Sequence, residues 1–251
     1  MNALSNIKTI TKRELAAYFS SPLAYVFIVI FLLLCGFFTF MVGAGLFGIG
    51  EASLVHPFFD WHPWFYLFLV PAVGMRLWAE ERRVGTIELL LTMPITAWQA
   101  IVGKFLASWL FLALALVLTF PVVLTVNYLG SPDNGVIFSG YIGSWLMAGA
   151  YLAISCMTSA MTRTQVVSFI ISVVLCLFLI LAGFPPVINL LSGWAKSWQW
   201  LVDAITSLSV ITHFENFQRG VLDSRDVLFF LSLIVFSLFS TSVILRGHRA
   251  G

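Results

Sequence analysis

Long apolar segments, each about 20 residues and nearly free of charge, follow one another along almost the whole sequence. A helix of roughly this length is needed to cross the hydrocarbon core of a bilayer. The chain is 60% hydrophobic with a mean hydropathy of +1.00, and 10% of its residues are charged, against roughly 25% in soluble domains. The sequence therefore excludes an ordinary soluble domain and predicts an all-α integral membrane protein.

The lengths of the apolar segments predict six transmembrane helices in a single domain, residues 1–251. The first segment mixes basic and apolar residues at helical spacing, which is typical of an amphipathic helix on the membrane surface. The apolar run after Pro22 is too long for a cleavable signal, so we expect it to remain as the first span. The expected elements are an interfacial helix at 1–21, spans at 22–46, 58–78, 97–127, 141–161, 166–183 and 227–245, and extracytoplasmic helices at 187–224.

Two local patterns make sharper structural predictions. Thr96 and Gln99 have the spacing of a capping box, which predicts the start of a helix after Pro94. In the segment 141–161, small residues recur four positions apart, at Gly149 and Ala153 and again at Ser155 and Ser159. Small residues at this spacing let membrane helices approach closely, so we expect this span to pack at the centre of the bundle.

If the chain crosses the membrane six times, its positive charges are distributed unevenly between the two sides of the membrane. Ten of the thirteen basic residues fall on the side of the two termini, and seven of the eleven acidic residues fall on the other side. Basic residues accumulate in cytoplasmic loops, so both termini are expected in the cytoplasm. The basic residues on that side are Lys8, Lys12, Arg13, Arg76, Arg82, Arg83, Lys104, Arg163, Arg246 and Arg249.

Charge is concentrated in one short segment between the second and third spans. Six of the 24 Lys, Arg, Asp and Glu residues lie between Arg76 and Glu88. A charged, glycine-containing segment between two apolar ones predicts a polar loop that contacts something water-soluble. The net charge of +2 is explained by loop asymmetry, and we expect no nucleic-acid partner.

The chain lacks the sequence motifs with which a transporter would power transport by itself. It contains no G-x-x-x-x-G-K-[ST] sequence that would hold nucleotide phosphates, and its predicted spans carry no ionisable residue at mid-depth. We therefore expect it to be non-catalytic and to receive energy from a separate soluble partner acting on the charged segment.

The cysteine and histidine residues are the candidates for reactive or metal-binding sites. Cys35, Cys156 and Cys176 all lie in apolar runs, which favours buried, unreactive thiols. His56 and His62 are six residues apart with Asp60 between them, a pattern that could bind a metal but equally suits a membrane interface. We expect the chain to bind no metal, and a membrane enzyme with an extracytoplasmic metal site is the alternative.

Residues 80–94, EERRVGTIELLLTMP, resemble the coupling-helix signature of ABC-2 type permeases, roughly E-[EK]-x-x-x-G-T-x-E-x-L-L-x-x-P. Residues 12–22 and 213–223 further resemble the gliding-motility-associated branch of these permeases. The resemblance implies an ABC-2 exporter-type fold with a short cytoplasmic coupling helix in residues 79–96. It also implies a location in the bacterial inner membrane.

The same resemblance implies the partners. Two copies of an ATP-binding cassette ATPase, which hold ATP and Mg²⁺, would pair with this chain and a second permease copy, identical or different. A periplasmic accessory protein is a further expected partner, since the complex would either export a substrate or transmit force. No cofactor is expected on this chain itself. A scaffold subunit without transport is a remaining alternative.

Two groups of candidate residues follow from the resemblance. In the coupling group, Gly85, Thr86 and Glu88 would shape and cap the coupling helix, while Arg82, Arg83 and Met93 would face the ATPase. A turn at Gly85 and an N-cap at Thr86 also follow from the residue types themselves. The residues of the coupling group are Glu80, Glu81, Arg82, Arg83, Gly85, Thr86, Glu88, Met93 and Pro94.

The second group lies before the last span, in residues 213–223. It is expected to form an extracytoplasmic gate or a dock for a partner, with packing over the fifth span as an equal alternative. Its residues are His213, Phe214, Glu215, Phe217, Arg219 and Gly220.

Overall fold

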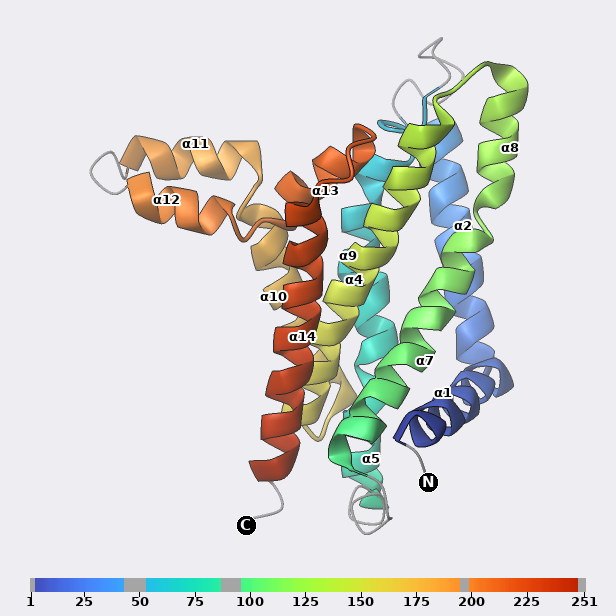
Figure 1. Ribbon diagram of the computed structural model, residues 1–251, viewed down its shortest axis with the longest axis vertical. Coiled ribbons are helices and arrows are strands. Elements are labelled where there is room, and N and C mark those ends of the chain that lie inside the picture. The colour runs from blue at the N-terminus through green and yellow to red at the C-terminus, as the bar shows by residue number, and fades with distance from the viewer. Residues whose placement is uncertain (1–2, 43–52, 87–95, 195–198, 248–251) are drawn as a thin grey trace.

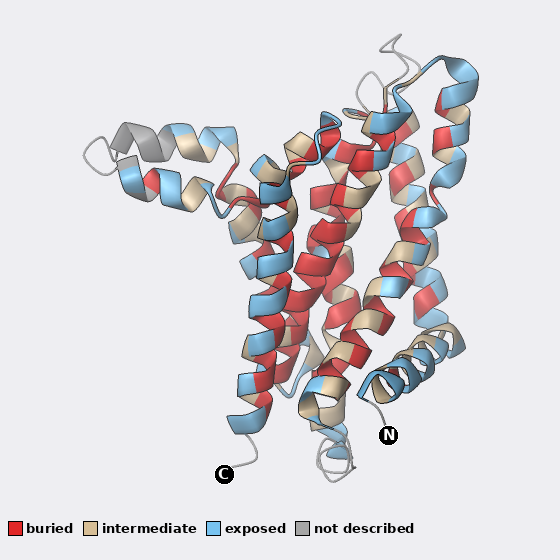
Figure 2. Ribbon diagram, viewed as in Figure 1, coloured by how far each residue is buried: buried red, intermediate tan, exposed pale blue. Residues whose placement is uncertain are grey.

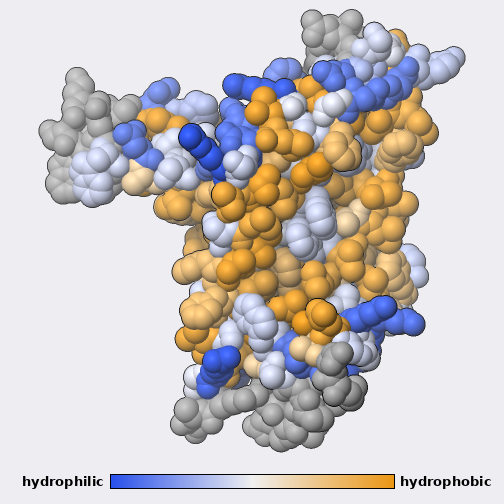
Figure 3. Space-filling view, in the orientation of Figure 1, coloured by the Kyte–Doolittle hydropathy of each residue, from blue (hydrophilic) through white to orange (hydrophobic). Residues whose placement is uncertain are grey.

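The computed structural model describes residues 3–42, 53–86, 96–194 and 199–247, and within these ranges every regular element is a helix. The helices form an elongated bundle (Figure 1). On the face shown in Figure 3, hydrophobic side chains cover the middle and hydrophilic ones gather toward both ends. The helices along the bundle are α2 (Pro22–Met41), α4 (His62–Gly74), α7 (Ala97–Val117), α9 (Asn134–Met161), α10 (Gln165–Leu181) and α14 (Ser224–Gly247).

The shorter helices distinguish the two ends of the bundle. At one end, which we call the α5 end, lie α5 (Arg76–Val84), α1 (Ala3–Ser20) across the bundle, and the first and last described residues (Figure 1). The other end, which we call the α13 end, carries η1 (Phe59–Trp61) and α13 (Val210–Gln218). Near the α13 end, α11 (Pro185–Trp194) and α12 (Gln199–Thr206) project sideways as a hairpin.

Four helical segments are long and apolar enough to cross a membrane: α2, residues 97–129, α9 and α14. The other two predicted spans fall on α4, which has 13 residues, and α10, which has 17. Both lie along the bundle in Figure 1, beside the longer helices. The all-helical architecture is therefore observed, and the count of six spans stays a prediction.

Helix α9 is the centre of the bundle, as the small-residue spacing predicted. It packs against α4, α7, α10, α13 and α14, and most of its residues are buried (Figure 2). A Cβ atom at Gly149 would lie 2.7 Å from Nε1 of Trp109, so the missing side chain lets α7 approach closely. The predicted central position of this span is confirmed.

The predicted third span, 97–127, falls within the apolar segment 97–129 that is long enough to cross a membrane, but this segment is not one continuous helix. The structure divides it into α7 and α8 (Phe120–Leu129), separated by Leu118 and Thr119. Pro121 explains the break, because its ring would clash with the carbonyl of Val117 and it has no N–H to donate. The start of α7 is confirmed, since Thr96 and Gln99 form both hydrogen bonds of a capping box.

Other predicted boundaries also shift. The second span, 58–78, is divided into η1, α4 and the start of α5. The fourth begins at Asn134 instead of residue 141, because Asp133 caps it by accepting hydrogen bonds from the N–H groups of Gly135 and Val136. The helices expected at 187–224 begin at Pro185, and Ser224 already belongs to α14. The end of the first predicted span, residues 43–46, lies outside the described residues.

Candidate functional site

The charged segment begins on α5, and Ser159 of α9 makes three hydrogen bonds to the backbone at its start. The hydroxyl of Ser159 donates to the carbonyl of Met75 at 2.8 Å and accepts from the N–H groups of Trp78 and Ala79, both at 3.0 Å. In a continuous helix the N–H of Ala79 would bond directly to the carbonyl of Met75. A side chain inserted in this way is a recognised cause of a helix break, which explains why α4 ends and α5 begins here.

The inner face of α5 is apolar and buried. Leu77, Trp78 and Ala79 are all buried, and Nε1 of Trp78 donates to Sγ of Cys156 at 3.2 Å. All three cysteines are free and buried, which confirms the prediction that they are packed inside the bundle. The first turn of α5 is therefore fixed to the centre of the bundle.

The polar end of this attachment is an ion cluster around Lys104 of α7. Its ammonium group lies 2.8 Å from Oε1 of Glu81 on α5 and 3.3 Å from Oε2 of Glu14 on α1. The same ammonium lies 5.7 Å from the ring centroid of Trp78. The Lys104 side chain is only 6% exposed, so the two carboxylates are its neutralising partners within the described residues. This Lys104 cluster joins α1, α5 and α7 at one point.

The cluster also changes the protonation of Glu14. Burial raises the pKa of its carboxyl, but the charges of Lys104 and Arg13 and their hydrogen bonds outweigh burial and lower the pKa below its usual value. Glu14 is therefore a carboxylate at neutral pH.

Helix α1 is tied to α7 by further contacts along its length. The Asn6 amide donates to Oε1 of Gln99 at 3.2 Å, and the hydroxyls of Tyr18 and Ser108 are 2.9 Å apart. A Cβ atom at Gly103 would lie 2.7 Å from Cγ2 of Ile10, so α1 rests directly on the α7 backbone. These contacts attach α1 to α7 at several points along its length.

The outer face of α5 carries the charges that remain accessible. The side chains of Glu80 and Arg83 are 47% and 63% exposed and form a loose pair at 3.9 Å. Arg82 instead donates to the carbonyl of Ala160 at 2.6 Å, and burial together with the nearby charge of Arg163 lowers its pKa. The structure therefore directs Glu81 and Arg82 toward the bundle and leaves Glu80 and Arg83 on its surface.

Gly85 ends α5 in a left-handed conformation with φ of +80°, which favours glycine. Thr86 follows, and its hydroxyl lies 3.5 Å from the carbonyl of Glu81. The other predicted coupling residues, Glu88, Met93 and Pro94, lie outside the described residues, as does the helix that Thr86 is predicted to cap.

The sequence prediction missed Lys104 and Glu14 as parts of this site. The sequence placed Lys104 only among the basic residues on the side of the termini, and Glu14 falls in the predicted interfacial helix 1–21, 90 positions earlier. The available signal was Lys104 itself, because an ionisable residue in an apolar helix needs a partner.

The second predicted group lies at the α13 end, and two of its six members are buried. Phe214 and Phe217 are buried, and a Cβ atom at Gly143 of α9 would meet the Phe217 ring at 2.6 Å. Gly220 has φ of +83° and forms the turn after α13. Glu215 and Arg219 remain on the surface, with side chains 47% and 71% exposed.

His213 connects α13 to α14. Its Nδ1 lies 2.6 Å from Oδ1 of Asp226, and Nδ2 of Asn216 donates to the other carboxylate oxygen at 2.9 Å. Nε2 of His213 lies 3.2 Å from the carbonyl of Ser207, and its ring stacks on Phe229 with centroids 4.0 Å apart. Asp226, only 3% exposed, is thus satisfied by two partners.

The metal-binding alternative does not fit the geometry. His56 pairs with Asp60 at 2.9 Å on the surface, but His62 is buried among aromatic rings with Nδ1 3.0 Å from the carbonyl of Phe58. Among the described residues, no three His, Cys, Asp or Glu side chains are placed to hold a metal ion. The three residues proposed for a metal site are not brought together.

Comparisons with known proteins identify the central part of the chain. A family profile described as ABC-2 family transporter protein matches residues 64–221, which extend from α4 to the turn after α13. The matched region includes α5, Lys104 and the whole of α9. A comparison with curated proteins found no match.

Proposed function

The chain belongs to the ABC-2 family of transporter proteins and is a membrane-spanning permease component, and from this premise we propose that residues 80–94 couple it to separate ATPase subunits. The family implies an ATPase partner and a dimeric arrangement. The proposal gives this chain the mechanical part of the work, since ABC-2 permeases are the membrane components of transporters and not themselves catalytic. ATP and Mg²⁺ would be held by the partner.

The observation that carries the proposal is the two-sided character of α5. Its inner face is fixed to α9 through Ser159 and to α1 and α7 through Lys104. Its outer face presents Glu80 and Arg83 to the surrounding solvent. A helix that is rigidly attached on one side and charged on the other is suited to receive force from a soluble partner and pass it to the bundle.

The contacts define a path for that force. A partner that displaces α5 would pull on Glu81, and Lys104 would transmit the displacement to α7 and, through Glu14, to α1. Ser159 would transmit it to α9. We propose that these connections move several helices together in response to ATP binding or hydrolysis in the partner.

The orientation, partners and cargo belong to the same proposal. The α5 end would face the cytoplasm of a bacterial cell, with the permease pairing with a second copy over two ATPase subunits. The complex would export a substrate or transmit force to a periplasmic protein, and membership of the gliding-motility-associated branch stays a prediction. The positive charges near the α5 end support this orientation.

Affinity purification from detergent-solubilised membranes tests the coupling surface. We expect an ATPase to copurify with the wild-type chain and to be depleted with Glu88→Arg and with Arg83→Glu. Arg246→Glu is the matched control, because it reverses an exposed charge at the same end of the bundle but on α14. Equal recovery of the ATPase with all four chains would refute the assignment of residues 80–94.

A further inference from the structure

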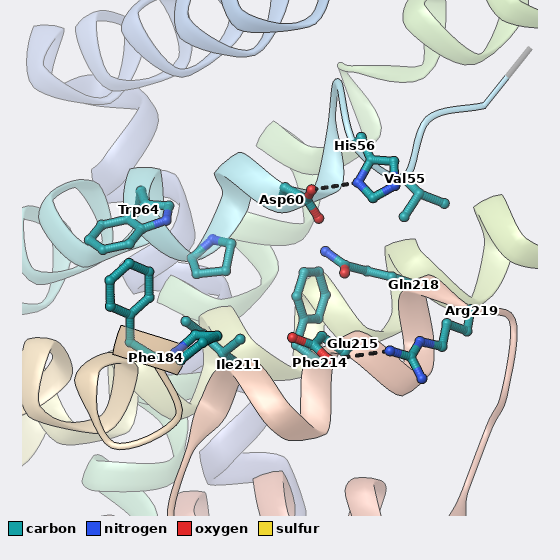
Figure 4. A pocket seen from close by; sticks show the side chains of 12 residues that line it. Val55, His56, Asp60, Trp64, Phe184, Ile211, Phe214, Glu215, Gln218 and Arg219 are labelled. Carbon is teal, nitrogen blue, oxygen red and sulfur yellow. Dashed lines mark hydrogen bonds and ion pairs between the residues drawn. The ribbon is translucent and has the colours of Figure 1, made fainter. Parts of the chain in front are cut away.

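A cleft of about 580 Å³ opens at the α13 end and is separate from the coupling surface. It lies between the start of α4, the junction of α10 with α11, and α13 (Figure 4). One part of its lining is charged and another is aromatic, so the cleft has a polar and an apolar region. Clefts of this size with a few convergent polar groups are typical ligand sites.

The charged part consists of two exposed pairs of side chains, His56 with Asp60 and Arg219 with Glu215. Nδ1 of His56 lies 2.9 Å from Oδ2 of Asp60, and a guanidinium nitrogen of Arg219 lies 3.6 Å from Oε2 of Glu215. The four side chains are between 44% and 79% exposed. Exposed pairs of this kind contribute about 0–1 kcal/mol, so a ligand can replace them at little cost.

Gln218 adds a neutral polar group to the lining of the cleft. The residue as a whole is only 6% exposed. Figure 4 shows the amide directed into the cleft between Asp60 and Glu215. A side-chain amide offers two donors and an acceptor, so it can bond either charged end of a molecule that enters the cleft.

The apolar part is aromatic and preformed. Trp64 and Phe184 meet edge to face with centroids 6.1 Å apart, and Phe214 is 1% exposed. Tryptophan is characteristic of the level where lipid headgroups meet the hydrocarbon region. The cleft therefore extends from charged groups toward the depth expected for the start of the acyl chains.

We propose that this cleft binds a zwitterionic amphiphile, with an ammonium group at Asp60 and Glu215, an acidic group at Arg219 and Gln218, and an apolar body against Trp64 and Phe184. The aminophospholipid headgroup has this chemistry. A purely anionic headgroup would face two carboxylates, and a purely cationic one would leave Arg219 without a new partner. The inference goes beyond coupling to an ATPase and does not depend on it.

The test uses native mass spectrometry of the detergent-purified chain with dioctanoyl phosphatidylethanolamine as the probe. Wild type and a variant are mixed in one solution, where their masses separate them and their lipid occupancies are compared directly. Arg219→Ala and Gln218→Leu should each lower the affinity about tenfold, as expected from losing one charged or buried hydrogen bond. Arg225→Ala, an exposed arginine outside the cleft lining, should bind like wild type.

Two further probes test whether binding needs both the ammonium group and the acyl chains. Dioctanoyl phosphatidylglycerol has the same chains without the ammonium and should bind about tenfold more weakly, and phosphoethanolamine, which lacks the chains, should bind weakly as well. Equal binding of both lipids, unaffected by Arg219→Ala, would show unselective lipid adhesion and overturn the proposal. Binding of phosphoethanolamine as tight as that of the lipid would overturn its amphiphilic part.

Discussion

The two ends of the bundle use similar charged residues in opposite ways. At the α5 end, Lys104 is buried and shared by two carboxylates from other helices. At the α13 end, Arg219 pairs with Glu215 one turn away on the same helix, and both remain largely in solvent. Burial thus makes the first group a rigid connection between helices, whereas exposure leaves the second free to exchange partners.

His213 and Asp226 show that the difference follows burial and not position along the bundle. They lie at the α13 end, yet Asp226 is as enclosed as Lys104 and joins two helices. The same end therefore contains one fixed pair and two exchangeable pairs. Substitutions of single residues can measure this contrast directly.

The largest effect is expected from Lys104→Met. It leaves the carboxylates of Glu14 and Glu81 without their shared cation, which should lower the free energy of unfolding by about 3–5 kcal/mol. Denaturation of the purified chain in mixed detergent micelles measures this. The triple variant Glu14→Gln/Glu81→Gln/Lys104→Met should recover much of the loss, and a cost below about 1 kcal/mol for Lys104→Met alone would contradict a buried connection.

Asp226→Asn should have the next largest effect. The charge that holds His213 is lost and the Asn amide cannot satisfy both neighbours as acceptor, so we expect a loss of about 1–3 kcal/mol. Asp203→Asn is the matched control because Asp203 is exposed on α12. If the two variants unfold at the same denaturant concentration, the His213 pair is not a fixed connection.

Acid should weaken the α5 end through Glu14. Because the folded-state pKa of Glu14 lies below that of an unfolded glutamate, about 4.3, its stabilising contribution is fully present above that pH. The contribution is lost as the pH falls through the lowered folded-state value. The free energy of unfolding, measured as a function of pH, should therefore fall less at low pH for Glu14→Gln than for wild type. Identical pH profiles of the two chains would count against the ionised cluster.

The smallest effect is expected from Glu215→Gln. Its pair with Arg219 is exposed, so removing the charge should change the free energy of unfolding by less than about 1 kcal/mol and less still at high salt. The same denaturation assay measures it beside Lys104→Met. A loss as large as that of Lys104→Met would remove the distinction between the two ends.

Local patterns in the sequence predicted the parts of the fold that depend on neighbouring residues. The capping box at Thr96 and Gln99 is confirmed because its hydrogen bonds close within one turn. The small residues of α9 predicted close packing because small side chains allow any neighbouring helix to approach closely, whichever part of the sequence it comes from. The break at Pro121 was also accessible from the sequence, since proline disrupts the preceding turn in any context.

The sequence alone was insufficient where two distant segments meet. Ser159 breaks the α4–α5 helix because its hydroxyl enters from α9, and its own sequence neighbourhood indicates only a small residue. The shared role of Glu14 and Glu81 depends on how α1 and α5 approach Lys104. His62 was grouped with His56 by spacing, but the turn through η1 buries one ring and exposes the other.

The central claim is that the Lys104 cluster carries movement of α5 to α1. The most direct measurement is the distance between spin labels at Lys12→Cys on α1 and Arg246→Cys on α14, in the complex with its ATPase, with and without ATP. The native cysteines are buried and should not be labelled. We predict that ATP changes this distance in the otherwise wild-type chain but not in Glu81→Gln, provided that the ATPase still copurifies. An equal change in both chains would contradict transmission through the cluster.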